Sequence, residues 1–278
     1  MRIGVRAHDF GRLPAEELAG RIAAKGLCCV QLALSKAIAG LDLQPGNLNP
    51  GMGYEIGQAF QRHGIQIAVL GCYINPIHPD PDTRGELLGL FEEHLRYARD
   101  FGCGLVALET GSVRADYSFH PDNHGERAFQ MFLTSIAGLV AEAEKFGVIV
   151  GIEGVTTHVV SSPARMRRVL DAIGSNNLQV VFDPVNLLSM ENWQKQDRVM
   201  QETFDYLGDR IAVVHAKDFI IRDETFTAVP TGRGHLNYAL LLALIQKRKP
   251  YVSILLEEAS EETVEECTRY IHSIARNL

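Results

Sequence analysis

Four side chains with metal-binding chemistry close four consecutive apolar segments in the second half of the chain. Glu153, Asp183, His215 and Glu257 each follow a short run of Val, Ile, Leu or Phe, and neighbouring members lie roughly one strand–helix unit apart. An ionised carboxylate at the end of a buried strand costs several kcal/mol unless a partner compensates it, and three carboxylates together repel one another. A divalent cation removes this repulsion, with His215 as a neutral fourth ligand. The spacing therefore predicts a metal site made by these four residues.

The donor atoms of this predicted site narrow the choice of metal without deciding it. Carboxylate oxygens favour Mn²⁺ or Mg²⁺, because these ions prefer oxygen to thiolate ligands. Zn²⁺, Co²⁺ and Fe²⁺ stay open, since imidazoles and carboxylates bind such ions as well. A purely structural interpretation also stays open, in which each acid forms an ion pair or caps the helix that follows its strand.

Apolar segments that alternate with amphipathic ones predict the scaffold that holds these residues. The apolar segments lack polar alternation, which is typical of parallel strands buried on both faces, and they cover residues 2–7, 27–34, 65–72, 105–109, 148–153, 178–183, 212–215 and 253–257. Helical patterns, with apolar residues every three or four positions, cover 14–25, 83–101, 126–146, 163–173, 237–247 and 261–275. This order predicts a single α/β domain, a (β/α)8 TIM barrel over residues 1–278. Active sites of such barrels lie where the strands' carboxyl ends meet.

The composition is that of an ordinary globular protein, with 46% hydrophobic and 22% charged residues. The net charge of −7 opposes binding to nucleic acid. We find neither an apolar signal segment at the start nor a membrane-spanning stretch of about 18 apolar residues. The five cysteines include no CxxC pair, which indicates reduced thiols. We therefore expect a cytoplasmic protein with no nucleic-acid partner and no membrane partner.

Five short segments, in their order and spacing, carry a family resemblance. They are Gly151-Ile152-Glu153, residues 178–186, residues 213–218, Gly232-Arg233-Gly234 and Leu255-Leu256-Glu257. On these segments the sequence resembles the xylose isomerase-like TIM barrel superfamily, the sugar phosphate isomerase/epimerase group. The resemblance implies an isomerase or epimerase of a small carbohydrate, in which Glu153 and Glu257 bind the metal and also transfer protons at carbon through a metal-stabilised enediolate. It also makes a homo-oligomer plausible.

Six further residues are predicted to contact the substrate. Asn186 stands where epimerases of this group usually carry a His, and His158 follows Glu153 within one loop. The others are Glu109, His8, Lys217 and Arg233. For three of them a local alternative stays open: a loop hydrogen bond for His8, an ion pair with Arg114 for Glu109, and a turn around Gly234 for the Arg233 loop.

Three other functions stay open on sequence grounds. One is a phosphodiesterase like the apurinic-site endonucleases, although the chain lacks their cluster of histidines and is acidic. Another is a dehydratase or isomerase of inosose-type polyols, which shares the metal chemistry. The third is a non-catalytic sugar-binding barrel, because a fold and an intact site do not prove turnover.

Overall fold

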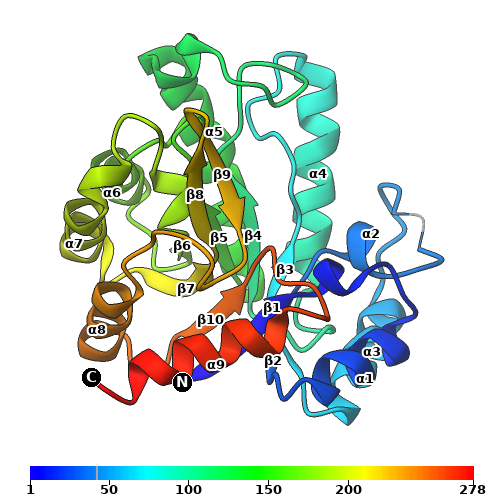
Figure 1. The fold of residues 1–278 in the computed structure, drawn as a ribbon. Helices are drawn as coiled ribbons and strands as arrows, with labels where there is room; N and C mark the ends of the chain where they lie inside the picture. The colour runs from blue at the N-terminus through cyan, green and yellow to red at the C-terminus, as the bar shows by residue number, and fades with distance from the viewer. Residues whose placement is uncertain (42) are drawn as a thin grey trace.

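Eight parallel strands close into a barrel in the computed structural model, which describes residues 1–41 and 43–278 (Figure 1). Around the barrel they follow the order β1-β10-β7-β6-β5-β4-β3-β2. Their bounds are β1 Arg2–Arg6, β2 Cys29–Leu32, β3 Gln66–Gly71, β4 Leu105–Glu109, β5 Ile149–Glu153, β6 Leu178–Phe182, β7 Ile211–Ala216 and β10 Ser253–Leu256. The structure confirms the predicted single-domain TIM barrel.

Helices connect successive strands and surround the barrel (Figure 1). The longer ones are α1 Ala15–Ala24, α3 Pro50–Arg62, α4 Pro81–Tyr97, α5 Glu126–Phe146, α6 Pro163–Ile173, α7 Gln196–Leu207, α8 Tyr238–Arg248 and α9 Val264–Ala275. Shorter pieces are α2 Leu34–Ala37, η1 Ala7–Phe10, η2 Pro121–His124, η3 Val185–Leu187 and η4 Trp193–Lys195. Local sequence explains the boundaries of α6, because the Ser162 hydroxyl accepts a hydrogen bond from the Arg165 amide and Gly174 takes the left-handed conformation that ends the helix.

The structure adds elements that the sequence patterns did not predict. Helices α3 and α7 have no counterpart among the predicted ranges, and an antiparallel hairpin of β8 Asp218–Arg222 and β9 Thr225–Val229 follows β7. The hairpin turns through Asp223 and Glu224, which have φ values of 48° and 56°. Two successive positive φ values are typical of a tight hairpin turn, but the usual Asn-Gly signal is absent from this sequence.

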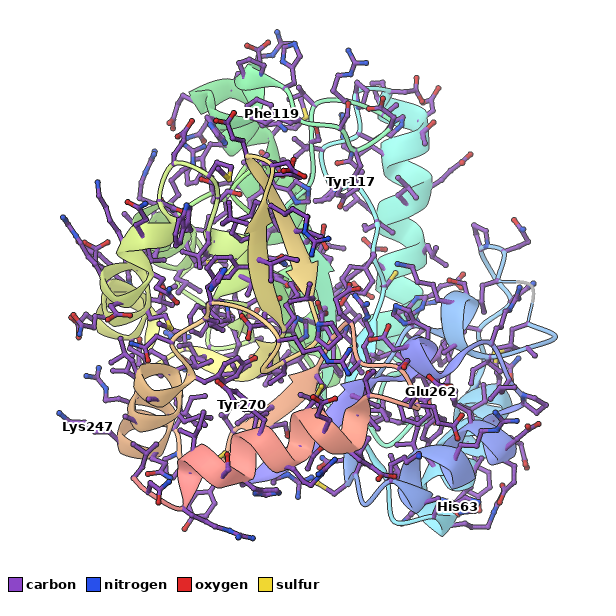
Figure 2. The ribbon with its side chains drawn as sticks, in the orientation of Figure 1. His63, Tyr117, Phe119, Lys247, Glu262 and Tyr270 are labelled. Carbon is purple, nitrogen blue, oxygen red and sulfur yellow. The ribbon has the colours of Figure 1, made fainter. Side chains whose placement is uncertain are left out.

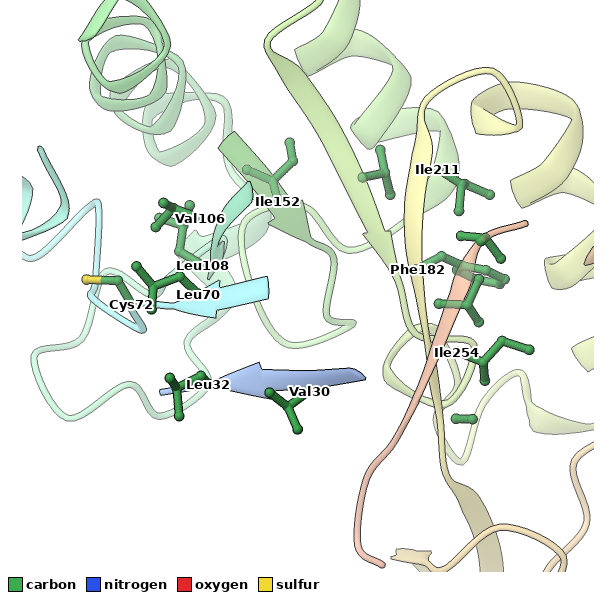
Figure 3. Packing of buried hydrophobic residues seen from close by; sticks show 14 of the residues in the cluster. Val30, Leu32, Leu70, Cys72, Val106, Leu108, Ile152, Phe182, Ile211 and Ile254 are labelled. Atoms are coloured by element: carbon green, nitrogen blue, oxygen red, sulfur yellow. The ribbon is translucent and has the colours of Figure 1, made fainter. Parts of the chain in front are cut away.

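Apolar residues form two layers, one inside the barrel and one between the strands and the surrounding helices. One layer lies between strands and helices and includes Val30, Leu70, Ile152 and Phe182 (Figure 3). A smaller group lies inside the barrel and is formed by Cys29, Val69, Leu105, Ala107, Val181, Val213 and Leu255. Since side chains alternate along a strand, the residues two positions after members of this inner group also point inward. This alternation decides which side chains reach the rim.

The two ends of the barrel differ in the loops they present. Figure 2 places Tyr117, in the loop after β4, at one end and His63, in the turn between α3 and β3, at the other. The first end carries the strands' carboxyl termini and therefore the predicted site. Among the described residues, no helix has the length and apolar character needed to cross a bilayer.

Candidate metal and active site

One polar side chain from each strand, or from just beyond its end, points into the rim of the barrel. Asp183, His215 and Glu257 lie two residues after the inner apolar residues Val181, Val213 and Leu255. The rim residues in barrel order are Arg6, Gln31, Tyr73, Glu109, Glu153, Asp183, His215 and Glu257. All but Asp183 and His215 line a cavity of about 360 Å³. The barrel interior thus changes from apolar to polar within one layer of side chains.

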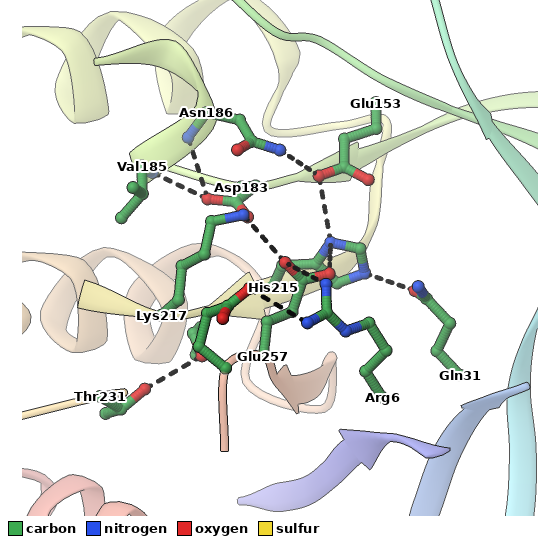
Figure 4. A network of polar contacts seen from close by, with 12 residues as sticks. Arg6, Gln31, Glu153, Asp183, Val185, Asn186, His215, Lys217, Thr231 and Glu257 are labelled. Atoms are coloured by element: carbon green, nitrogen blue, oxygen red, sulfur yellow. Dashed lines mark hydrogen bonds and ion pairs between the residues drawn. The ribbon is translucent and has the colours of Figure 1, made fainter. Parts of the chain in front are cut away.

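The four predicted metal ligands meet in this layer (Figure 4). Potential ligand atoms of Glu153, Asp183 and His215 lie within 4.8 Å of one another, and all three residues are buried. The Nδ1 atom of His215 is 3.2 Å from Glu153 Oε1 and 3.3 Å from Glu257 Oε1. Asn186 donates a hydrogen bond of 2.7 Å to the same oxygen of Glu153.

Lys217 lies between two of these acids. Its Nζ atom is 2.9 Å from Asp183 Oδ2 and 2.9 Å from Glu257 Oε2. Burial opposes the ammonium, but Asp183 and Glu257 outweigh it and raise the pKa of Lys217 well above its usual value. The ammonium therefore compensates part of the carboxylate charge.

The same cluster of charges also shifts the pKa values of His215 and Glu257. Burial opposes a charged imidazole, yet Glu153 and Glu257 raise the pKa of His215 to about 9. Burial also works against the Glu257 carboxylate, while Lys217, His215 and Arg6 hold its pKa well below the usual range. The cluster is thus a set of opposite charges whose buried members shift one another's pKa values.

The donor set fits a divalent cation. Asp183 Oδ1 accepts hydrogen bonds from the amides of Val185 and Asn186, which orient the carboxylate. Among the described residues, its buried Oδ2 accepts no well-aligned hydrogen bond, and it lies 2.9 Å from the Lys217 ammonium. A buried carboxylate oxygen without such a donor is suited to a metal, and the neighbouring Glu153 and His215 supply the oxygen and nitrogen ligands that such ions take.

The opposite half of the rim carries other predicted residues. His158 Nδ1 is 3.5 Å from Glu109 Oε2, whereas Arg114 lies near Asp116 and not near Glu109. Burial, together with Glu153 and Glu257, raises the pKa of Glu109 to about 7. Burial lowers the pKa of His158 to about 4.

Five of the six predicted substrate residues line the cavity, namely His8, Glu109, His158, Asn186 and Lys217. Burial, Arg6 and Lys36 lower the pKa of His8 to about 4. The structure does not bring Arg233 to the cavity. Its exposed guanidinium pairs with Glu266 on α9 at 2.6 Å, and Gly232 turns the loop with a φ of 83°.

Several cavity residues escaped the sequence interpretation, namely Arg6, Gln31, Lys36, Tyr73 and Tyr117. Arg6 is 3.6 Å from Glu257 Oε2 and also pairs with Asp9 and Glu258. Gln31 carried a usable signal, because it is a lone amide within the apolar segment 27–34. Tyr73 carried none, since an aromatic residue after a strand is equally typical of a core.

Comparisons with known proteins agree with this fold. The family model described as "Xylose isomerase-like TIM barrel" matches residues 21–274. A probable L-ribulose-5-phosphate 3-epimerase of Mycoplasma pneumoniae is 25% identical over 184 residues, which is 65% of this chain. The matched part spans 55% of that relative's length.

Solved structures share the fold at low sequence identity. A D-psicose 3-epimerase from Clostridium cellulolyticum H10, determined with D-tagatose, has a TM-score of 0.74, 14% identity and coverage of 100% of this chain and 99% of its own. The IolI protein, whose structure holds a zinc atom, has a TM-score of 0.75, 13% identity and coverage of 100% and 99%.

Proposed function

Because this chain belongs to the xylose isomerase-like TIM barrel family, we propose that it is a metal-dependent epimerase or isomerase of a small ketose or ketose phosphate. The observation that carries the proposal is the position of Glu153 and Glu257. Both carboxylates approach Nδ1 of His215, within 3.3 Å, at the edge of a cavity of about 360 Å³. They come from β5 and β10, which are separated around the barrel by β6 and β7.

In the proposed site, Glu153, Asp183, His215 and Glu257 hold one divalent ion. Mn²⁺ or Mg²⁺ suits three carboxylates and one imidazole, and Zn²⁺, Co²⁺ or Fe²⁺ are alternatives. The zinc atom in the IolI structure supports screening zinc as well. Such an ion polarises the carbonyl and hydroxyl oxygens of a ketose and stabilises the negative charge that develops on them.

The proposed chemistry is a proton transfer at carbon. One glutamate carboxylate takes a proton from the carbon beside the substrate carbonyl, and the electron pair of that C–H bond moves towards the carbonyl oxygen. The other glutamate, in its protonated form, returns a proton from the opposite side, which inverts the carbon. Return to the neighbouring carbon would give an isomerase instead.

Five of the other cavity residues orient Glu153 or hold the sugar in this proposal. Asn186 keeps the Glu153 carboxylate oriented through its hydrogen bond of 2.7 Å. Glu109, His158, His8 and Lys217 offer hydrogen-bonding groups to substrate hydroxyls from the cavity wall. Arg233 has no part in the proposal, because it lies outside the cavity.

The decisive experiment is solvent hydrogen exchange at carbon. Protein loaded with each candidate metal is incubated in D₂O with D-psicose, D-tagatose and L-ribulose 5-phosphate, and deuterium at carbon is followed by NMR. We expect exchange and epimer formation with at least one ketose. Loss of water from an inosose-type polyol would favour the dehydratase. Cleavage of an abasic oligonucleotide would favour the phosphodiesterase, and tight sugar binding without exchange would favour a non-catalytic barrel.

The metal site has its own test. His215→Ala is expected to stay folded and to lose metal affinity by about 100-fold or more, because the imidazole and the orientation it imposes are both removed. Metal content after dialysis is measured by elemental analysis, with His63→Ala on the far end of the barrel as the matched control. Equal metal content in both variants would remove this site from the proposal.

A further inference from the structure

A chain of hydrogen bonds leads away from His215, on the side opposite the acids. The Nε2 atom of His215 lies 2.6 Å from the side-chain oxygen Oε1 of Gln31, and both residues are buried. The amide nitrogen of Gln31 donates to the hydroxyl of Tyr73. The chain therefore runs from the predicted metal ligand, through one buried amide, to the cavity wall (Figure 4 shows its His215–Gln31 bond).

The chemistry of an amide fixes the direction of each bond. An amide oxygen only accepts and an amide nitrogen only donates. Nε2 of His215 must therefore carry a proton, whether the imidazole is neutral or charged. In the neutral ring, Nδ1 is then the unprotonated atom, and Nδ1 is the nitrogen that faces Glu153 and Glu257. Gln31 thus selects the tautomer that can bind a metal between these acids.

The direction of the hydrogen bond from Gln31 also determines the role of the Tyr73 hydroxyl. Its oxygen accepts from Gln31, so its own proton points elsewhere, and among the described residues the structure records no acceptor for that proton. Burial, with Glu153, Glu257 and Glu109 nearby, raises the pKa of Tyr73 well above its usual value. The phenol therefore stays protonated at neutral pH and remains a donor.

A second tyrosine in the same cavity shows the contrast. Tyr117 also lines the wall, but its hydroxyl donates a hydrogen bond of 2.8 Å to the backbone carbonyl of Ile74. Its proton is already used by the protein. Of these two hydroxyls, only that of Tyr73 has a proton left for a molecule in the cavity.

We propose that Gln31 is a positioning residue for His215 and that the Tyr73 hydroxyl donates a hydrogen bond to a carbonyl or hydroxyl oxygen of the bound sugar. The Tyr73 half rests on the proposed function, whereas the Gln31 half depends only on metal binding. Gln31 therefore links two tasks through one amide: it orients a metal ligand with its oxygen and a substrate donor with its nitrogen.

The Gln31 half is tested without any substrate. In ¹⁵N NMR of the Zn²⁺-loaded wild type, we expect His215 to carry its proton on Nε2. Gln31→Leu should lose this single tautomer and weaken Zn²⁺ binding by about 10- to 100-fold, the range seen when a partner of a metal-bound His is removed. Gln31→Glu, which keeps an acceptor, should retain both properties. Unchanged Zn²⁺ affinity and an unchanged His215 tautomer in Gln31→Leu would overturn the positioning role.

The Tyr73 half is tested by kinetics on the ketose that the wild type turns over. Tyr73→Phe should raise KM about tenfold with unchanged Zn²⁺ affinity, since one hydrogen bond to substrate is lost. Gln31→Glu should raise KM similarly, because the new carboxylate accepts a hydrogen bond from the Tyr73 hydroxyl and leaves it no proton to donate to the substrate. Tyr117→Phe, the matched control, should lower thermal stability while KM stays within about twofold.

The outcomes separate this inference from the function itself. If the wild type turns over a ketose and Tyr73→Phe has the KM of the wild type, the substrate role of Tyr73 is wrong and the proposed function stands. If the wild type neither binds nor turns over any ketose, the proposed function and the Tyr73 role fall together. The NMR and Zn²⁺ measurements on Gln31→Leu still decide the positioning role in that case.

Discussion

The two sides of the barrel rim carry the same kinds of side chain and give them opposite properties. In the half formed by β5, β6, β7 and β10, acids surround His215 and raise its pKa to about 9. On the other side, His8 follows β1 and His158 lies beside Glu109 at the end of β4, and burial lowers the pKa values of both to about 4. Burial alone would lower the pKa of all three imidazoles. The charges next to each imidazole therefore decide its protonation state.

Glu153 and Glu109 offer the sharpest comparison of the two halves. They lie opposite each other in the register of β5 and β4. Glu153→Gln is expected to slow hydrogen exchange at carbon by about 10³-fold or more, since a general base and a metal ligand are lost together. Glu109→Gln should slow it by no more than about tenfold, because it removes a single substrate contact. Equal losses in the two variants would make both acids catalytic and abolish the distinction.

Substitution of Lys217 tests how far protein stability depends on compensation of the buried carboxylate charges by its ammonium group. Lys217→Met leaves Asp183 and Glu257 buried without their cation, and removal of one partner of a buried pair costs roughly 3–5 kcal/mol. We expect a loss of that order in the unfolding free energy of metal-free protein, measured in urea, and a smaller loss with a saturating divalent ion. Lys145→Met, which removes an exposed ion pair with Glu142, is the control. The same loss with and without metal would show that Lys217 does not share the charge of the metal site.

The shifted pKa values of His215 and His158 predict opposite pH dependences of stability in the metal-free protein. The folded-state pKa of His215 is raised from 6.5 to about 9, so its stabilisation is complete below pH 6.5 and is lost as pH rises through 9. The folded-state pKa of His158 is lowered from 6.5 to about 4, so its contribution is complete above pH 6.5 and is lost as pH falls towards 4. NMR titration of the ring carbons checks both signs, and parallel titrations near 6.5 would contradict them.

Substitution of Arg233 is expected to have the smallest effect on kcat/KM. Its guanidinium is exposed, pairs with Glu266 and lies away from both halves of the rim. Arg233→Ala should change kcat/KM by less than about twofold, as is usual for surface substitutions. A larger loss confined to phosphorylated ketoses would restore Arg233 as a substrate residue and extend the site to the loop before α8.

The acidic half could be predicted from the sequence, and the other half only in part. Glu153, Asp183, His215 and Glu257 stand out because each is a charged or metal-binding residue after an apolar run. Glu109, His8 and His158 were also found, since they follow strands or lie in the next loop. Arg6, Lys36 and Tyr73 were missed because arginines, lysines and tyrosines near strand ends are common in structural roles. The position of Arg233 outside the cavity could not be predicted, because a glycine-flanked loop does not reveal its direction.

The sequence by itself determined the barrel and which strands end in acids, because the order of apolar and amphipathic segments and the two-residue alternation along strands are local properties. Tertiary structure decided the rest. Closure of β1 onto β10 brings Arg6 to Glu257, and closure of the whole ring brings Gln31 to His215, 184 residues away in the chain. Protonation, tautomer and hydrogen-bond direction depend on such distant partners and on shared burial, and these exist only once the ring of strands is complete.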